Sequence, residues 1–361
     1  MGGNYTQPRF ILLGITNTPW AQAPLFVLFL LIYIVTLVGN IGLMVLVWVA
    51  PSLHTPMYFF LTHFSLADVC YSTVISPKML TDLLFGDKTI SWLGCVTQFH
   101  LFALFVTAEC HLLAVMAYDR HVAICHPLSY VLVVSPRACW QLVAWCYLVA
   151  SLSALLYTGC TFGGSFCGPN HVDHFFCDAS PVLRLACSDT RGCEAAIFTL
   201  AAANGLGTSV VILLSYGRIL HAVLGTSSAP SRARVFRTCA SHLASVAVFY
   251  GSLFFMYLQP ASRHGSRDKV ASVLYTVVSP MLNPFIYSLR NREVKAALGR
   301  VLIHRNTKGF VTAQPWRRKF PLGMDDFGSS SLKRRPALVL ELKSTSSISL
   351  AKSRKFSLPI P

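Results

Sequence analysis

Seven apolar stretches, each at least 20 residues long, constrain this chain more than any other feature of its sequence. They cover residues 24–49, 57–80, 92–116, 138–158, 195–220, 238–258 and 270–289. A bilayer core takes about 20 mostly apolar residues per helix. Lipid cannot hydrogen-bond the backbone, so such stretches must be helical. The sequence therefore predicts an all-α membrane protein built as a seven-helix bundle.

The parts outside these stretches differ in character. Residues 1–23 form a short outer segment, and residues 24–303 make the bundle together with a short amphipathic eighth helix near residues 293–302. Residues 304–361 are rich in Ser, Pro and basic residues, a composition that buries too little apolar surface to fold. We expect a disordered cytoplasmic tail there, whose basic clusters either lie on anionic lipid or are simply solvated.

Lys and Arg set the orientation, because they accumulate on the cytoplasmic side of membrane proteins. Of the 30 Lys and Arg residues, 16 follow Leu289, and four Arg without any acid lie between residues 218 and 237. We expect the N-terminus outside, where Asn4 of Asn4-Tyr5-Thr6 is a glycosylation acceptor. The net charge of +16 is mostly in the tail, so it does not indicate nucleic-acid binding.

Eight short strings resemble signatures of one family, the olfactory receptors, within the rhodopsin-like G protein-coupled receptors. The resemblance runs from about Asn4 to Leu302. The strings are Gly39-Asn40, the segments 53–61, 65–68, 116–128 and 174–178, Ser215-Tyr216, and the segments 238–243 and 280–291.

The resemblance implies a function. A small volatile odorant would bind within the bundle and activate a stimulatory, olfactory-type G protein, which raises cyclic AMP, at the plasma membrane. It implies no cofactor. The sequence carries no pattern typical of a catalytic triad, a metalloprotease or a phosphate-binding loop, so we do not expect an enzyme.

The segment 116–128 contains the expected coupling switch. Arg120 carries a permanent charge and a planar fork of donors, so it can pair with Asp119 at rest and meet the G protein on activation. Tyr216 and Tyr287 resemble the family tyrosines that swing in to meet this Arg, with core packing as the alternative. Asn283-Pro284 is expected to break the last helix, because proline removes a backbone hydrogen bond.

Asp68 and Glu109 are the only acids deep inside the expected helices, and intramembrane acids are usually functional. In the family the matching pair is thought to hold sodium or share a proton. Two alternatives stay open: a protonated structural pair, and the proton relay of a transporter. The transporter is the main competing function.

Four of the 12 Cys stand out, because they lie at the expected outer side, where disulfides are stable. By resemblance, Cys95 pairs with Cys177 and Cys167 pairs with Cys187. The sequence from His171 to Cys177 could also suggest a metal site, but a bonded Cys177 has no thiolate to offer.

The outer half of the third expected helix, residues 99–107, carries no acid, and no Lys follows Lys269 in the seventh. These absences exclude an amine-receptor Asp and a retinal Schiff base, and they favour an apolar pocket for small organic molecules. By resemblance its lining is Phe102, Ala103, Val106, Thr107, Asn204, Tyr250, Leu253, Tyr257 and Thr276.

Three residues depart from the family pattern on the expected cytoplasmic side. They are His121, Ser129 and Arg237, and the long tail is also atypical. These departures bear on G protein coupling more than on the fold or the ligand class.

Overall fold

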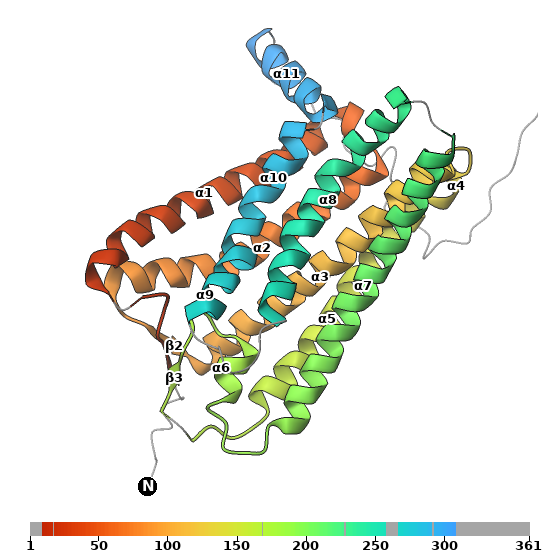
Figure 1. Ribbon diagram of the computed structural model, residues 1–361. Helices are drawn as coiled ribbons and strands as arrows, with labels where there is room; N and C mark the ends of the chain where they lie inside the picture. Colours follow the sequence, from red (N-terminus) through yellow and green to blue (C-terminus); the bar gives the residue numbers. More distant parts are fainter. Residues whose placement is uncertain are drawn as a thin grey trace, which may run out of the picture. The chain divides into compact units, whose positions relative to one another are not determined.

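The computed structural model describes residues 9–16, 18–167, 169–226, 229–257, 266–290 and 292–307, and most of these residues are helical. Seven long helical segments run side by side (Figure 1). They are α1 (Pro19–Val49), α2 (Pro56–Phe85), α3 (Trp92–Cys125), α5 (Pro136–Phe162), α7 (Arg191–Thr226), α8 (Ala229–Tyr257) and a composite of α9 (Ser266–Val273), the π-helical η3 (Leu274–Val278) and α10 (Ser279–Arg290). The prediction of seven helices is confirmed, and each extends beyond its apolar stretch at one end or both.

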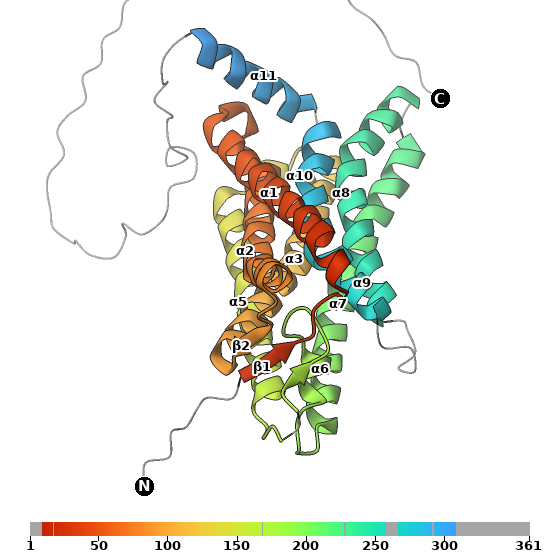
Figure 2. The ribbon, with the colours of Figure 1, turned by 90° about the vertical axis from the view of Figure 1, so that its left-hand side faces the viewer.

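Helix α3 holds the bundle together, because it packs against α2, α5, α7 and α8. Helix α1 packs on α2 and α10, and Figure 2 shows it lying across α2. The turns between helices include η1 (Pro51–Leu53), α4 (Tyr130–Val133) and α6 (Ala179–Leu183). In the described part of the chain, α3 therefore contacts four of the other six long helical segments.

Local sequence explains where several helices begin and end. The Ser91 hydroxyl accepts a hydrogen bond from the Gly94 N–H at 3.1 Å and caps α3, and Ser135 caps α5 in the same way. These bonds satisfy backbone donors that a helix leaves unpaired at its start. Helix α2 ends at Gly86, whose φ of +71° is left-handed backbone that glycine adopts without strain.

The outer surface of the bundle is apolar, while several polar residues lie inside. Val38, Trp145 and Leu213 are 67%, 60% and 71% exposed, whereas Asn40 and Asp68 are fully buried. An apolar exterior of this extent suits lipid and would be unfavourable in water. Among the described residues, five helices are long and apolar enough to cross a membrane, and α8 contains a shorter apolar stretch, Cys239–Leu253.

A three-stranded sheet lies at one end of the bundle. Strand β1 (Arg9–Leu12) is central, antiparallel to β2 (Thr89–Ser91) and parallel to β3 (His171–Val172). We call this end the loop end, the opposite end the Arg120 end, and residues 163–190 between α5 and α7 the long loop. Residues 1–23 carry no local sequence pattern that predicts this strand, because it forms by pairing with distant segments.

The last transmembrane helix differs from its expected form. Pro284 lies inside α10, which continues through it to Arg290, and the irregular turn is the π-helical η3 further back. The expectation of a break at Pro284 was therefore wrong. Pro284 has no N–H to donate to the Pro280 carbonyl four residues earlier. That carbonyl instead accepts a hydrogen bond from Asn40 Nδ2 on α1 at 3.0 Å.

Gly39 makes this contact between helices possible. A Cβ atom added at Gly39 would lie 2.8 Å from Pro284 Cγ, too close for α1 and α10 to keep their positions. Gly39 thus lets α1 approach α10, and Asn40 then supplies the hydrogen-bond donor for the Pro280 carbonyl. The neighbouring Asn283 does not fill that role, because its Nδ2 donates to both oxygens of Asp68 at 3.1 Å.

Helix α11 (Arg292–Thr307) corresponds to the expected eighth helix and extends past it into the first residues assigned to the tail. It is anchored at the Arg120 end. The Tyr58 hydroxyl donates to Glu293 at 2.8 Å, Arg300 donates to Ser52 at 2.9 Å, and Val294 is buried in the core. The rest of the expected tail, residues 308–361, lies outside the described residues.

Candidate functional site

Two disulfide bonds hold the long loop at the loop end. Cys95 at the start of α3 is bonded to Cys177, and Cys167 is bonded to Cys187 within the loop. Both pairs implied by the resemblance are therefore present. The first bond joins α3 to the loop across 82 residues of sequence, and a link across so long a loop strongly restricts the unfolded chain.

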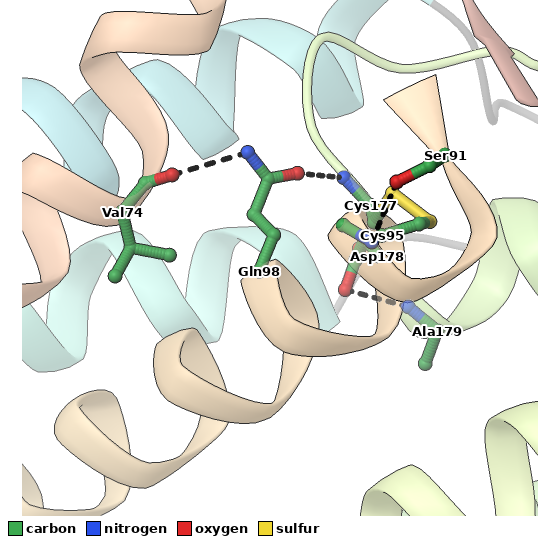
Figure 3. The surroundings of a disulfide bond; sticks show 8 residues. Val74, Ser91, Cys95, Gln98, Cys177, Asp178 and Ala179 are labelled. Carbon is green, nitrogen blue, oxygen red and sulfur yellow. Dashed lines mark hydrogen bonds between the residues drawn. A yellow bond between two sulfur atoms is a disulfide. The ribbon is translucent and has the colours of Figure 1, made fainter.

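Gln98 reinforces the first disulfide (Figure 3). Its side-chain oxygen accepts the Cys177 N–H at 2.9 Å, and its Nε2 donates to the Val74 carbonyl of α2 at 3.1 Å. Gln98 is 5% exposed, so both bonds are made where water has little access. One side chain thus joins α2, α3 and the long loop.

The N-terminal segment and the long loop are also tied to α9. The Lys269 ammonium donates to the Gly14 carbonyl at 2.9 Å and pairs with Asp173 at 2.8 Å. His174 is buried, stacks on Phe175 and lies 3.2 Å from the Ser272 hydroxyl. Burial lowers the pKa of His174 to about 3, so this ring is neutral at ordinary pH.

Aromatic side chains fill the space beneath the long loop. Phe102 of α3 packs against Phe176 of the loop, with ring centroids 5.1 Å apart, and against Tyr71 and Tyr275. All four rings are buried. The Tyr71 hydroxyl donates to the Tyr275 carbonyl in η3. The loop therefore packs directly on a residue that the sequence analysis assigned to the ligand pocket.

The candidate ligand residues lie on four elements that surround this region. Helix α3 carries four of them, α7 one, α8 three and η3 one. Ala103, Thr107, Tyr250 and Thr276 are buried, Val106, Asn204 and Leu253 are half-buried, and the side chain of Tyr257 lies outside the described residues.

Three polar candidates, Asn204, Tyr250 and Thr276, have hydrogen-bond partners within the protein. Asn204 Nδ2 is turned toward α5, where it donates to Ser153 Oγ at 3.2 Å and Tyr157 Oη at 3.5 Å. The Tyr250 hydroxyl donates to Thr208 of α7 at 2.6 Å, and Thr276 donates to a backbone carbonyl of its own helix. The structure thus joins Tyr250 to α7 and Asn204 to α5, rather than gathering all the polar groups around one point.

One cleft lies elsewhere at the loop end. It is bounded by the N-terminal segment, α2 and the long loop, and none of the nine candidate ligand residues lines it. Its lining residues are Gly14, Ile15, Thr16, Gln22, Met79, Asp82, Leu83, Lys88 and Phe175.

The intramembrane acids Asp68 and Glu109 lie together. Both are buried, and their carboxyl groups are close enough to share a hydrogen bond. In the described part of the chain, Glu109 Oε1 and Asn283 Oδ1 are buried oxygens that accept no hydrogen bond. Buried acceptors without donors are unfavourable. A cation or an additional proton would satisfy them, so the oxygens present fit either ligand.

At the Arg120 end the expected ion pair is formed. Arg120 donates to Asp119 at 2.9 Å, and the Tyr130 hydroxyl of α4 donates to the other Asp119 oxygen at 2.8 Å. Asp119 is 1% exposed. An ion pair this enclosed needs further hydrogen bonds to offset desolvation, and Tyr130 supplies one.

The two expected switch tyrosines lie near Arg120, but each contacts other side chains. Tyr216 is hydrogen-bonded to His242 Nδ1 at 2.8 Å, and His242 Nε2 lies 3.0 Å from the Leu113 carbonyl. Tyr287 is buried, and its ring packs against Phe64 with a centroid distance of 6.3 Å. His242 of α8 therefore links Tyr216 of α7 to the Leu113 carbonyl of α3.

The three departing residues lie around this end. His121 is buried and its ring contacts that of His126, while Ser129 directly precedes the short helix α4. The side chain of Arg237 and the residue Asn4 lie outside the described residues.

The structural roles of Gln98, Tyr130 and His242 were not predicted from the sequence. His242 was inside a quoted string, 238–243, and its presence in an apolar helix was the available signal. Gln98 offered the same kind of signal, a polar residue within the apolar stretch 92–116. Tyr130 offered none, since its role comes from the fold that brings its hydroxyl to Asp119.

Comparison with known proteins gives concordant matches. The family model described as "Olfactory receptor" matches residues 29–305. Olfactory receptor 8U9 of Homo sapiens is 50% identical over 305 residues, which are 84% of this chain and 99% of that protein. Olfactory receptor 8U3 of Mus musculus is also 50% identical over 305 residues, covering 84% of this chain and 94% of that protein.

Among solved structures, squid rhodopsin superposes on this chain with a TM-score of 0.62. The two are 18% identical, and the match covers 78% of this chain and 81% of the rhodopsin chain. This likeness concerns the fold.

Proposed function

Because the chain belongs to the olfactory receptor family, we propose that it is an odorant receptor that activates a stimulatory, olfactory-type heterotrimeric G protein and thereby raises cyclic AMP. Proteins of this family are signalling receptors and not enzymes. The apolar helices and the family membership make the chain a multi-pass membrane protein. No cofactor is part of the proposal.

The proposed location is the plasma membrane, with the loop end outside. Two disulfides at that end support this orientation, since disulfides persist in oxidising compartments. The Arg residues between 218 and 237 belong to the opposite end, as the positive-inside tendency requires. Asn4 would then be exposed to glycosylation, and the basic residues after Leu289 would face the anionic inner leaflet.

The proposed ligand is a small volatile organic molecule. Four of the nine candidate residues on α3, α7, α8 and η3 are wholly apolar, and the polar side chains of Asn204, Tyr250 and Thr276 are already hydrogen-bonded inside the protein. A ligand there gains chiefly from burial of its apolar surface. An odorant that offers a hydrogen-bond acceptor would compete for the Asn204 or Tyr250 donors.

The observation that carries the coupling proposal is the closed Asp119–Arg120–Tyr130 arrangement. Arg120 is held by its neighbour while Tyr216 is held by His242. We assign this arrangement to the resting state. Outward movement of α8, which carries His242, would free Tyr216 and let Arg120 meet the G protein. The ligand favours that state only by the difference between its affinities for the two states.

Asp68 and Glu109 are proposed to hold a sodium ion or share a proton in the resting state. Their oxygens, together with Asn283, connect α2, α3 and α10. A cation bridging these helices would stabilise the packed form. The protonated structural pair and a transporter relay are the alternatives that the sodium experiment below distinguishes.

The test is a screen of volatile organic molecules against cells that express the chain, with cyclic AMP as the readout. We expect at least one chemical class to raise cyclic AMP, and Arg120→Ala to abolish the rise while surface expression stays near wild type. Arg137→Ala, an exposed arginine at the same end, is the matched control and should respond normally. A full response in Arg120→Ala would remove Arg120 from the coupling mechanism.

A further inference from the structure

Eight cysteines in the structure are not disulfide-bonded, and two of them touch. Cys160 lies in the last turn of α5 and Cys193 in the first turn of α7, and their thiols are close enough to interact. Both are half-buried, whereas Cys110, Cys139, Cys146 and Cys239 are fully buried. The pair is therefore accessible to small reagents in a way that the core cysteines are not.

The packing of α5 on α7 explains why the two thiols meet. Ser153, Tyr157 and Cys160 are spaced by four and three residues, which places them on one face of α5. Asn204 of α7 donates to both Ser153 and Tyr157, so this face is turned toward α7. Cys193 lies three helical turns before Asn204 on the corresponding face. Both cysteines therefore lie on the faces where α5 and α7 pack against each other, toward the same end of the two helices.

The pair lies at the loop end, where two other cysteine pairs are already bonded. We propose that Cys160 and Cys193 are a redox-active dithiol that closes reversibly to a third disulfide, clamping α5 to α7 beside the candidate ligand residue Asn204. The proposal rests on the orientation given above, in which the loop end faces an oxidising medium. Half-buried pairs of this kind are more easily reduced than enclosed structural disulfides.

The oxidant is a low-molecular-weight disulfide such as oxidised glutathione. One thiolate of the pair attacks a sulfur of the small disulfide, forms a mixed disulfide and releases one small thiol. The second protein thiolate then attacks the sulfur of the first cysteine and releases the other small thiol. Two protein thiols and one small disulfide give one protein disulfide and two small thiols, so electrons and protons balance. Reduced glutathione reverses both steps.

The experiment maps disulfides in the purified full-length chain after equilibration with oxidised or reduced glutathione. Free thiols are trapped by alkylation at low pH, and the chain is digested with trypsin. The tryptic peptide 192–218 contains Cys193 as its only cysteine, and peptide 138–184 contains Cys160. A second digestion with chymotrypsin, which cuts after Tyr157 and Phe162, isolates Cys160 in residues 158–162.

After both digestions we expect, under oxidised glutathione, the fragment 158–162 linked to 192–198, because chymotrypsin also cuts after Phe198. Under reduced glutathione we expect both cysteines to be alkylated. Cys160→Ser should abolish the link and leave Cys193 alkylated or glutathionylated. Cys70→Ser, at another half-buried free cysteine, is the matched control and should leave the link unchanged.

Three results would overturn the proposal: alkylated Cys193 under oxidised glutathione, a glutathione adduct on Cys193 without the link, or a link from Cys193 to a different cysteine. Because the wild-type fragments identify both partners, the test stands even if Cys160→Ser folds poorly. The readout is covalent and requires no signalling, so a receptor that fails to raise cyclic AMP still gives an answer.

Discussion

Replacing Gln98 with methionine should loosen the long loop without opening a cavity. Methionine has nearly the volume of glutamine and removes both polar groups. The Cys177 N–H would lose its acceptor, and the Val74 carbonyl would lose a donor. Both groups lie beside a side chain that is 5% exposed, so water cannot readily replace the lost bonds.

The size of the effect follows from these two groups. A buried N–H left without an acceptor costs about 1–3 kcal/mol, and the Val74 bond contributes about 0.5–1.5 kcal/mol. The added apolar side chain recovers about 1 kcal/mol. The free energy of unfolding should therefore fall by roughly 1–3 kcal/mol. In a chain of this size, about 2 °C of Tm corresponds to 1 kcal/mol, so we expect Tm to fall by about 2–6 °C.

The assay is thermal unfolding of the purified receptor in detergent, followed by tryptophan fluorescence at a fixed scan rate. Gln141→Met is the matched control, because Gln141 is exposed on α5 and surface substitutions change stability by about 0.5 kcal/mol or less. If Gln98→Met unfolds at the same temperature as Gln141→Met, the bridge among α2, α3 and the long loop does not stabilise the protein.

Three further predictions concern other contacts. Gly39→Ala should lower the free energy of unfolding by about 1–3 kcal/mol, because its Cβ would lie 2.8 Å from a proline carbon of α10. The control Gly42→Ala should be near neutral, because a Cβ there meets nothing within 4 Å. Equal Tm values for the two variants would refute the close approach of α1 and α10. The folded pKa of His174 is about 3, below its ordinary value of about 6.5, so the unfolded state binds the extra proton and stability falls as pH drops through this window, by at most about 1.4 kcal/mol per unit. In pH-dependent unfolding, His174→Gln should show a shallower loss than wild type between pH 6.5 and 5, and parallel curves would contradict this. Asp68→Asn should change basal cyclic AMP and its dependence on sodium at constant ionic strength; equal sodium dependence in wild type and variant would exclude the ion site, and proton-coupled substrate uptake that the variant loses would favour a transporter.

The number and course of the helices could be predicted from the sequence, because the determining property is local. A stretch of about 20 apolar residues has to be helical in lipid whatever surrounds it, and the seven stretches became the seven long helical segments. The Asp119–Arg120 ion pair could also be predicted, because the two residues are adjacent in the sequence. In the structure an Arg120 nitrogen lies 2.9 Å from an Asp119 carboxylate oxygen. The disulfide pairs followed from resemblance to a family, not from the spacing of the cysteines.

The partners of individual polar groups were decided only by the tertiary structure. The sequence predicts that Pro284 leaves a carbonyl unpaired. Only the approach of α1 at Gly39 makes Asn40 the hydrogen-bond partner of that carbonyl. The same holds for Gln98 and Cys177, which are 79 residues apart.

Strand β1 and the thiol pair depend on the packing in the same way. Strand β1 acquires its role from two distant strands, β2 and β3, that pair with it. Cys160 and Cys193 look like ordinary helix cysteines until α5 and α7 pack. Apolarity along one helix is sufficient to place it in a membrane, whereas a hydrogen bond or a thiol contact needs two atoms within a few ångströms. That proximity depends on how all the helices pack together, which no single stretch of sequence encodes.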